Sequence, residues 1–143
     1  MDIRLAHPEE AGRIAELVAT SKLPVAGLPQ AWRTWVAVDG HQLLGTASLE
    51  RHGDAYLLRS VAVRDDQRGR GVGAGLVRTA LAAIGPHQPV ALLTETAAAW
   101  FPRFGFHPVE RAALDPALAA SAEFSGACPA TAQAFVRPAP AKR

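Results

Sequence analysis

The spacing of apolar residues divides the chain into alternating strands and helices. Short apolar runs bounded by turn residues predict strands over residues 3–5, 35–38, 43–49, 55–63, 90–94, 106–110 and 133–136. Helical spacing predicts helices after Pro8-Glu9-Glu10, from Gly73 to about Ile84, and over 98–104. Shorter helical turns are expected near Ala31 and over 116–121. The pattern is that of a mixed α/β chain, with a hairpin at Asp39-Gly40.

A glycine-rich turn connects the strand over 55–63 to the helix that follows. It reads Arg68-Gly69-Arg70-Gly71-Val72-Gly73, and its three glycines lie within five residues. Without side chains to cover them, the backbone N–H groups at this helix start face outward, at the positive end of the helix dipole. Arg64, Arg68 and Arg70 add positive charge. The turn therefore predicts a binding site for a phosphate or pyrophosphate.

Spacing separates the families that use such a turn. A Walker loop is excluded, because Val72 follows Gly71 and Ala74 follows Gly73 where Lys and Ser or Thr are needed. The dinucleotide-binding pattern Gly-x-Gly-x-x-Gly/Ala is matched over 69–74. Its first glycine should follow the strand almost directly, however, and five polar residues intervene. The third pattern is Arg-x-x-Gly-x-Gly behind Val61-Ala62-Val63. A solvent-exposed loop that is rich in Gly and Arg by chance is the remaining alternative.

A second segment, over residues 92–106, supports the third pattern. It contains Trp100-Phe101-Pro102-Arg103-Phe104-Gly105-Phe106, and Gly105 suits a helix C-terminus that needs a positive φ. Together the two segments resemble the GCN5-related N-acetyltransferases (GNAT), over nearly the whole chain. The resemblance implies a mixed, mostly antiparallel central sheet of about six to seven strands, with helices on both faces.

The resemblance also implies acetyl-CoA as the cosubstrate, with its pyrophosphate in the turn and its pantetheine arm along the preceding strand. The implied contacts are Val61, Ala62, Val63, Arg68, Gly69, Arg70, Gly71, Val72, Gly73, Thr94 and Phe101. Thr94 stands where many relatives have Asn, although a strand-end Thr without that role fits as well. Phe101 takes the place of a Tyr that usually protonates the leaving thiolate. A thiol with a pKa of about 8.5 is an acceptable leaving group as its thiolate anion.

Transfer to an amine requires a neutral nitrogen, so a general base is expected. An amine with a pKa of about 10.4 is almost wholly protonated at neutral pH. Glu50, expected just after the strand over 43–49, is the first candidate, and Glu95 is the second. For Glu50 a solvated turn residue is the alternative. His52 would share its face if the strand continued, but Gly53-Asp54 suggests that the turn has begun.

Further segments resemble a narrower subgroup, the small acetyltransferases of arsenic-resistance operons, related to amino-acid N-acetyltransferases. These are residues 58–63, the Leu-Leu-Thr run before Glu95, and residues 120–130. The resemblance implies a small acceptor such as an amino acid, or a toxic amino acid containing arsenic or phosphorus. Arg59 and Ser60 are the candidate acceptor-binding residues, since a charge within a strand needs an anionic partner. An internal ion pair of Arg59 with Glu50, Asp54 or another acid is the alternative.

Two other functions remain open at this point. One is acetylation of a protein N-terminus or lysine, for which a shallower and more acidic groove is expected. The other is a module without catalytic activity that binds coenzyme A as a sensor, for which Phe101 is the best argument.

Length and composition indicate the number of domains, the kinds of partner and the cellular compartment. With 143 residues the chain fits a single domain over 1–137, followed by a flexible tail over 138–143. The net charge of +2 is too small to suggest nucleic acid, and no apolar run or signal sequence suggests a membrane. Cys128 is the only cysteine, so no internal disulfide can form, which fits a reducing cytoplasm. The resemblance to acetyltransferases of arsenic-resistance operons implies a bacterial protein. The five isolated histidines predict no metal site. A monomer or homodimer is expected.

Overall fold

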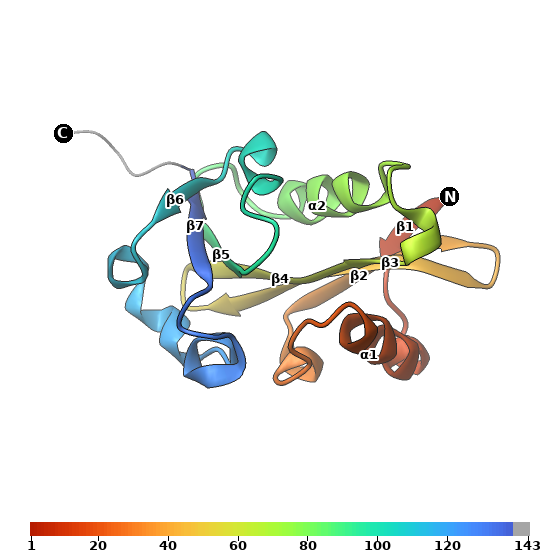
Figure 1. The fold of residues 1–143 in the computed structure, drawn as a ribbon, viewed down its shortest axis with the longest axis horizontal. Helices are drawn as coiled ribbons and strands as arrows, with labels where there is room; N and C mark the ends of the chain where they lie inside the picture. Colours follow the sequence, from red (N-terminus) through yellow and green to blue (C-terminus); the bar gives the residue numbers. More distant parts are fainter. Residues whose placement is uncertain (139–143) are drawn as a thin grey trace.

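The computed structural model describes residues 1–138, which fold around one seven-stranded sheet (Figure 1). The sheet order is β1-β2-β3-β4-β5-β7-β6. The strands are β1 (Asp2–Leu5), β2 (Arg33–Asp39), β3 (Gln42–His52), β4 (Ala55–Val63), β5 (Val90–Thr94), β6 (His107–Val109) and β7 (Gln133–Arg137). The first four form an antiparallel meander, β4 and β5 are parallel, and β7 is antiparallel to both of its neighbours. The predicted α/β sheet is confirmed.

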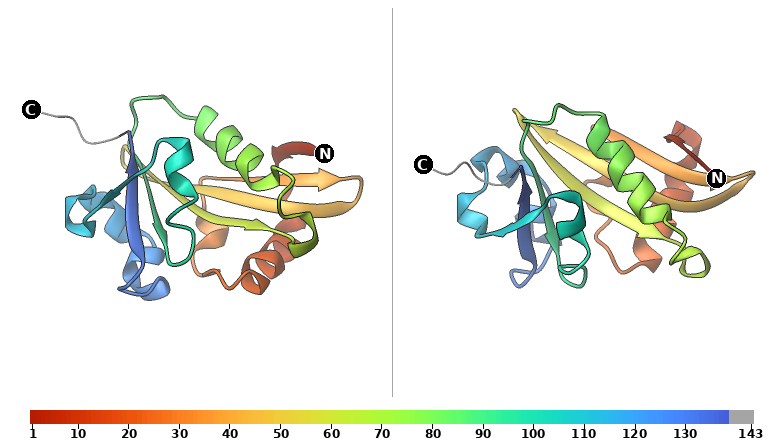
Figure 2. Two further views of the ribbon diagram at one scale, coloured as in Figure 1. Left: turned by 45° about the horizontal axis from the view of Figure 1, so that its top comes forward. Right: turned by 90° about the horizontal axis from the view of Figure 1, so that it is seen from above.

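Helices cover both faces of the sheet. The longer ones are α1 (Ala11–Thr20) and α2 (Val72–Ala82). The short helical segments are η1 (Pro8–Glu10), η2 (Leu28–Gln30), η3 (Asp65–Gln67), η4 (Phe101–Phe104), η5 (Arg111–Ala113), η6 (Pro116–Ala120) and η7 (Glu123–Ala127). Helix α2 lies on one face, whereas α1 and the segment from η5 to η7 lie on the other (Figures 1 and 2). The two faces of the sheet are therefore covered by different segments of the chain.

The alternation of side chains along each strand sorts the core into these two sides. On the α2 side, Leu49 and Leu58 pack with Leu76 in the largest apolar cluster. On the opposite side, one cluster forms under α1, and a separate one joins Leu57 to Leu118 of η6. Residues 57 and 59 of β4 share a face, so the Arg59 side chain emerges between these two smaller clusters.

Strand β4 contains a bulge close to where it parts from β5. Ser60 has φ 58°, and the register with β3 shifts between Thr46 and Ser48. Strands β4 and β5 pair only at Tyr56 with Val90 and at the following residue of each strand, and they diverge from there. The edge of β4 from residue 58 to 63 therefore faces an opening, with backbone groups that no neighbouring strand binds on that side.

Several predicted elements have different bounds. The helix expected over 98–104 is a turn followed by the short 3₁₀ segment η4, because Pro102 lacks the N–H that would continue an α-helix. Gly105 ends that segment with φ 88°, as expected. Strand β3 continues to His52, so the prediction that Glu50 follows the strand was wrong. The segment η7 was not predicted at all, since its five residues show no helical periodicity and include Gly126, which has φ 116°.

Two further predictions concern features beyond the sheet. Of the predicted tail over 138–143, residues 139–143 lie outside the described residues. Within residues 1–138, no helix combines the length and apolar character that a membrane crossing requires.

Candidate active site

The glycine-rich turn after β4 presents a row of free backbone N–H groups. Gly69 and Gly71 have φ values of 80° and 79°, and α2 begins immediately afterwards at Val72. The first backbone hydrogen bond of the helix runs from the N–H of Gly75 to the carbonyl of Gly71. Within the described residues, no N–H from 69 to 74 donates to a backbone carbonyl. Such a row at a helix start fits an anion.

The space around the turn leaves room for an anion. A Cβ at Gly69 or Gly71 would meet no atom within 4 Å, so both positions face open space. At Gly73 a Cβ would lie 3.3 Å from the indole ring of Trp100, so this glycine allows close contact between α2 and that side chain. The predicted cradle is therefore open toward solvent and closed on the side of Trp100.

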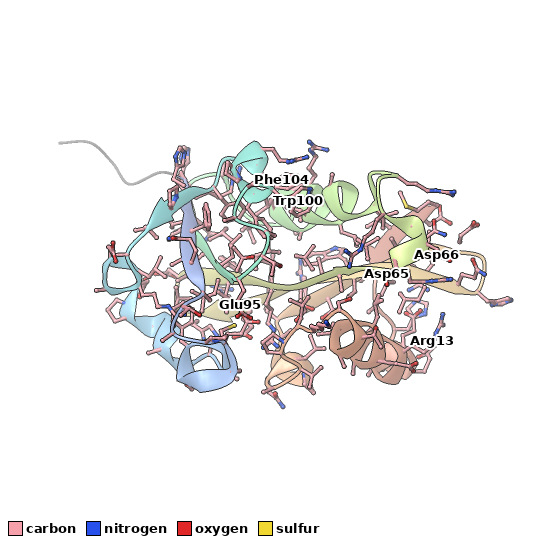
Figure 3. All side chains as sticks on the ribbon, viewed as in Figure 1. Arg13, Asp65, Asp66, Glu95, Trp100 and Phe104 are labelled. Carbon is pink, nitrogen blue, oxygen red and sulfur yellow. The ribbon has the colours of Figure 1, made fainter. Side chains whose placement is uncertain are left out.

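The arginines around the turn differ in whether they form ion pairs with nearby acids. Arg64 forms an ion pair with Asp66 at 2.7 Å, and Arg68 forms one with Asp65 at 3.3 Å (Figure 3 labels both acids). Arg70 forms no ion pair with any of residues 1–138. It is exposed, and we regard it as the cation most available to an anion in the turn.

The residues before the turn lie along the opening between β4 and β5. Val61 and Val63 pack toward the α2 side, and Ala62 is buried on the side of α1. Their side chains are thus used for packing, which leaves the backbone of the strand edge for a ligand. The Thr94 hydroxyl accepts the N–H of Ala97 at 3.0 Å, so it stabilises the turn after β5.

Phe101 belongs to an aromatic cluster rather than to the surface. Its ring is 7% exposed and lies 5.0 Å from Trp100 and 5.9 Å from Phe106, centroid to centroid. Figure 3 shows Trp100 beside Phe104, next to α2, and their rings are 4.8 Å apart. This cluster supports the wall of the opening near Gly73.

The first candidate base, Glu50, lies inside β3 and is part of a buried ionic cluster. Its Oε1 lies 2.6 Å from Nε2 of His52, and its Oε2 accepts from Nη1 of Arg59 at 2.8 Å. Only 6% of the Glu50 side chain is exposed. Burial alone would raise the pKa of Glu50, but hydrogen bonds from Arg59, His52 and Ser121 outweigh it and hold the pKa below its usual range.

Arg59 is the centre of this cluster. Its side chain is 0% exposed, and Nε donates to Oγ of Ser60 at 3.0 Å. Nη1 and Nη2 also donate to the carbonyls of Ala26 and Pro24, at 2.8 and 2.9 Å. The structure thus contains the internal ion pair that the sequence left as an alternative. An acceptor carboxylate could reach this guanidinium only by replacing a present partner.

A second buried acid, Glu123 of η7, completes the cluster. Its Oε2 lies 3.4 Å from Nε of Arg59. Burial raises the pKa of the Glu123 carboxyl to about 7, Arg59 opposes the rise, and Glu50 adds to it. Burial, together with Glu123, raises the pKa of the Cys128 thiol to about 12, so this thiol stays protonated and is a poor nucleophile.

The second candidate base, Glu95, lies apart from this cluster. It is exposed and directly follows β5, where that strand has diverged from β4. Figure 3 places it in the middle of the molecule, away from the acids beside the turn.

Sequence reasoning missed three members of the site. Glu123, His52 and Trp100 were not assigned roles, although each contacts a residue that was. For His52 the signal was present, since it lies two residues from Glu50 on a strand. For Glu123 no local pattern could reveal a partner 64 positions earlier in the chain.

Comparisons with known proteins agree with this geometry. A family model described as an acetyltransferase (GNAT) domain matches residues 30–108. No curated protein matches the chain. Among solved structures, a Mycobacterium tuberculosis protein, Rv2747, in complex with coenzyme A and a further ligand, is 21% identical with a TM-score of 0.72; the match covers 95% of this chain and 98% of that one.

Two more solved structures are similar. N-acetylglutamate synthase from Neisseria gonorrhoeae, complexed with coenzyme A and N-acetyl-glutamate, is 19% identical with a TM-score of 0.78; the match covers 95% of this chain but only 34% of the synthase. A GNAT family acetyltransferase from Brucella melitensis, in complex with acetyl-CoA, is 26% identical with a TM-score of 0.63, over 74% of this chain and 82% of that one. The chain therefore belongs to the GNAT acetyltransferase family and is an acetyl-CoA-dependent N-acetyltransferase.

Proposed function

We propose that this enzyme transfers the acetyl group of acetyl-CoA to the amino group of a small, amino-acid-like acceptor. The row of unpaired N–H groups from residue 69 to 74 carries the proposal, because it offers a pyrophosphate several donors at one helix start. The likeness in fold to N-acetylglutamate synthase supports an acceptor with an α-amino group beside a carboxylate.

Acetyl-CoA would bind along the opening between β4 and β5. Its pyrophosphate would lie in the turn, near Gly71 and Arg70. Its pantetheine arm would bond to the free backbone edge at Val61 and Val63. Thr94 and Phe101 border this path, the first through its turn and the second through the aromatic cluster.

The reaction would take place directly within a ternary complex. The neutral amine nitrogen attacks the thioester carbonyl carbon, a C–N bond forms and the C–S bond breaks. The electron pair of that bond stays on sulfur as the coenzyme A thiolate, and the proton lost by the amine goes to a base. No phenol stands at Phe101, so the thiolate would leave without a proton from that position.

We propose Glu50 as the group that draws the amine proton away, with His52 between it and the acceptor. Supporting this, the His52 side chain is 20% exposed, whereas the Glu50 carboxylate is buried beneath it at 2.6 Å. A carboxylate that binds an imidazole in this way stabilises the imidazolium formed when the ring takes a proton. Glu95, exposed beside the opening, is the second candidate.

Arg59 and Ser60 would affect the acceptor indirectly, by fixing the positions of the segments that surround the acceptor site. Arg59 binds the carbonyls of Pro24 and Ala26, in the loop that follows α1, and so holds that loop against β4. The loop also meets η7, because a Cβ at Gly27 would lie 3.0 Å from that of Ala122. The acceptor site would therefore lie beside this junction, with its walls fixed by Arg59.

The resemblance to acetyltransferases of arsenic-resistance operons suggests one particular class of acceptor. Amino-acid analogues that carry an arsenic or phosphorus oxyacid combine an α-amino group with an additional anionic group. We include them with the amino acids as the acceptors to test.

The experiment is an assay of coenzyme A thiol release over a panel of acceptors. The panel contains amino acids, their decarboxylated analogues, arsenic- and phosphorus-containing amino acids, and short peptides with a free N-terminus or lysine. Release with amino acids but not with decarboxylated analogues supports the proposal. Preference for peptides would replace it with protein acetylation, and binding of acetyl-CoA without any release would indicate a sensor.

The base is tested in the same assay. Glu50→Gln should lower turnover roughly a hundredfold at neutral pH, and the deficit should shrink as the pH approaches the pKa of the amine. His52→Asn should show the same pH dependence. A defect independent of pH would remove Glu50 as the base, and Glu95→Gln would then be compared.

A further inference from the structure

An open pocket of about 530 Å³ lies at the C-terminal end of α2, at the opposite end of the helix from the glycine-rich turn. Its charged lining consists of Arg78 from α2, Arg103 from η4 and Arg137 from β7. Its apolar lining includes Leu81, Ile84 and Phe104. The proposed reaction uses none of these residues.

The three arginines come from three different elements and have no acidic partner among residues 1–138. No Asp or Glu lines the pocket, and none of the three guanidinium groups forms an ion pair within residues 1–138. The pocket therefore concentrates like charges that no carboxylate of residues 1–138 neutralises.

Two of these side chains are also held in place. Nε of Arg103 donates to the carbonyl of Trp100 at 2.8 Å, which leaves its two terminal nitrogens for another acceptor. The guanidinium carbon of Arg78 lies 5.3 Å from the centroid of the Phe104 ring. Side chains ordered in this way lose less entropy when they bind a planar anionic group.

We propose that this pocket binds a small organic polyanion, a molecule with two or more carboxylate or phosphate groups on an apolar body. Guanidinium groups match carboxylate and phosphate oxygens in pairs, and the floor of Leu81, Ile84 and Phe104 matches an apolar body. The volume is in the range of small-molecule sites. The 11 residues of α2 separate it from the turn by about 16 Å, so it is a second anion site.

The test is a calorimetric titration at low ionic strength with benzene-1,3,5-tricarboxylate, which carries three carboxylates on one ring. We expect a Kd below about 1 mM, weakened about tenfold or more by Arg103→Gln or by Arg137→Gln. Benzoate, with one carboxylate, should bind at least tenfold more weakly. Arg13→Gln, on α1 and far from the pocket (Figure 3), is the matched control and should leave the Kd unchanged.

Acetyl-CoA distinguishes this pocket from the turn. Saturating acetyl-CoA should leave the affinity for the tricarboxylate within about twofold, and each variant should still bind acetyl-CoA, which shows that it is folded. The inference is overturned if the Kd exceeds about 1 mM, if the pocket variants bind as the parent does, or if acetyl-CoA or Arg70→Gln abolishes the binding.

Discussion

The glycine-rich turn and the Glu50–Arg59–Glu123 cluster are both polar sites beside β4, but they are built in opposite ways. In the turn, the backbone N–H groups from 69 to 74 donate to no backbone carbonyl of residues 1–138, and Gly69 and Gly71 face open space. In the cluster, the Arg59 side chain is 0% exposed and is bound by two acids and two loop carbonyls. The turn is arranged to receive a ligand, whereas the cluster already contains its counter-charges.

This contrast separates binding from positioning. An anion in the turn would gain hydrogen bonds that the protein does not make for itself. A ligand at Arg59 would first have to break bonds that connect β3, β4, η7 and the loop after α1. We therefore expect changes in the cluster to act mainly on stability, and changes in the turn to act mainly on acetyl-CoA affinity.

The largest effect is expected from removing the central charge of the cluster. Arg59→Met should lower the free energy of unfolding by about 3–5 kcal/mol, because Glu50 and Glu123 would remain buried without their cation. Urea denaturation measures the loss, and Arg51→Met, at an exposed position of β3, is the control. A loss below about 1 kcal/mol would show that water or the loop replaces the guanidinium without cost.

The next effect is a pH dependence of stability due to Glu123. Its carboxyl has a pKa of about 7 when folded, against 4.5 for an ordinary Glu, so the folded state binds the extra proton between these values. Stability should therefore fall by about 3 kcal/mol as the pH rises from 4.5 through 7, at about 1.4 kcal/mol for each pKa unit.

Glu123→Gln should remove this slope. The lowered pKa values of Glu10 and Glu50 change stability only at more acidic pH, and parent and variant contain the same histidines, so the difference between the two proteins from about pH 5 to 8 isolates Glu123. Denaturation curves of parent and variant across that window provide the measurement. If the free energy of unfolding of the two proteins changed in parallel with pH, Glu123 would stay ionised when buried.

In the turn, the strongest effect is expected at Gly71. Gly71→Val places a side chain in the space that a pyrophosphate would occupy, and should weaken acetyl-CoA binding roughly a hundredfold. Gly40→Val is the matched control, because Gly40 also has a positive φ, 59°, but lies in the hairpin between β2 and β3. Both variants carry similar backbone strain. Equal acetyl-CoA affinities in the two would place the ligand elsewhere.

A smaller difference is expected between the arginines of the turn. Arg70→Ala should weaken acetyl-CoA binding about tenfold at low salt, since its charge is not shared with an acid. Arg68→Ala should cost less, because Asp65 already offsets part of that charge at 3.3 Å. Calorimetry at two salt concentrations measures both. The reverse order would mean that the ion pair at Arg68 opens when the ligand binds.

The two sites also differ in how far the sequence predicts them. The turn was predictable because its chemistry is local: three glycines, a preceding strand and a following helix lie within about 30 residues. The cluster depends on contacts from Pro24 to Glu123, which only the folded sheet brings together. Strands β4 and β5 followed the predicted bounds, whereas the helix before Gly105 was overestimated because Pro102 limits it to a 3₁₀ turn.

NMR shows directly whether the turn receives acetyl-CoA while the Glu50–Arg59–Glu123 cluster acts as a positioning element. Acetyl-CoA is titrated into ¹⁵N-labelled protein, and the amides of the turn and the side-chain Nε–H of Arg59 are followed together. We expect the largest shifts at the amides from 69 to 74 and along the free edge of β4, with little change at the Arg59 Nε–H. Unchanged turn amides, or a dominant shift at Arg59, would contradict it.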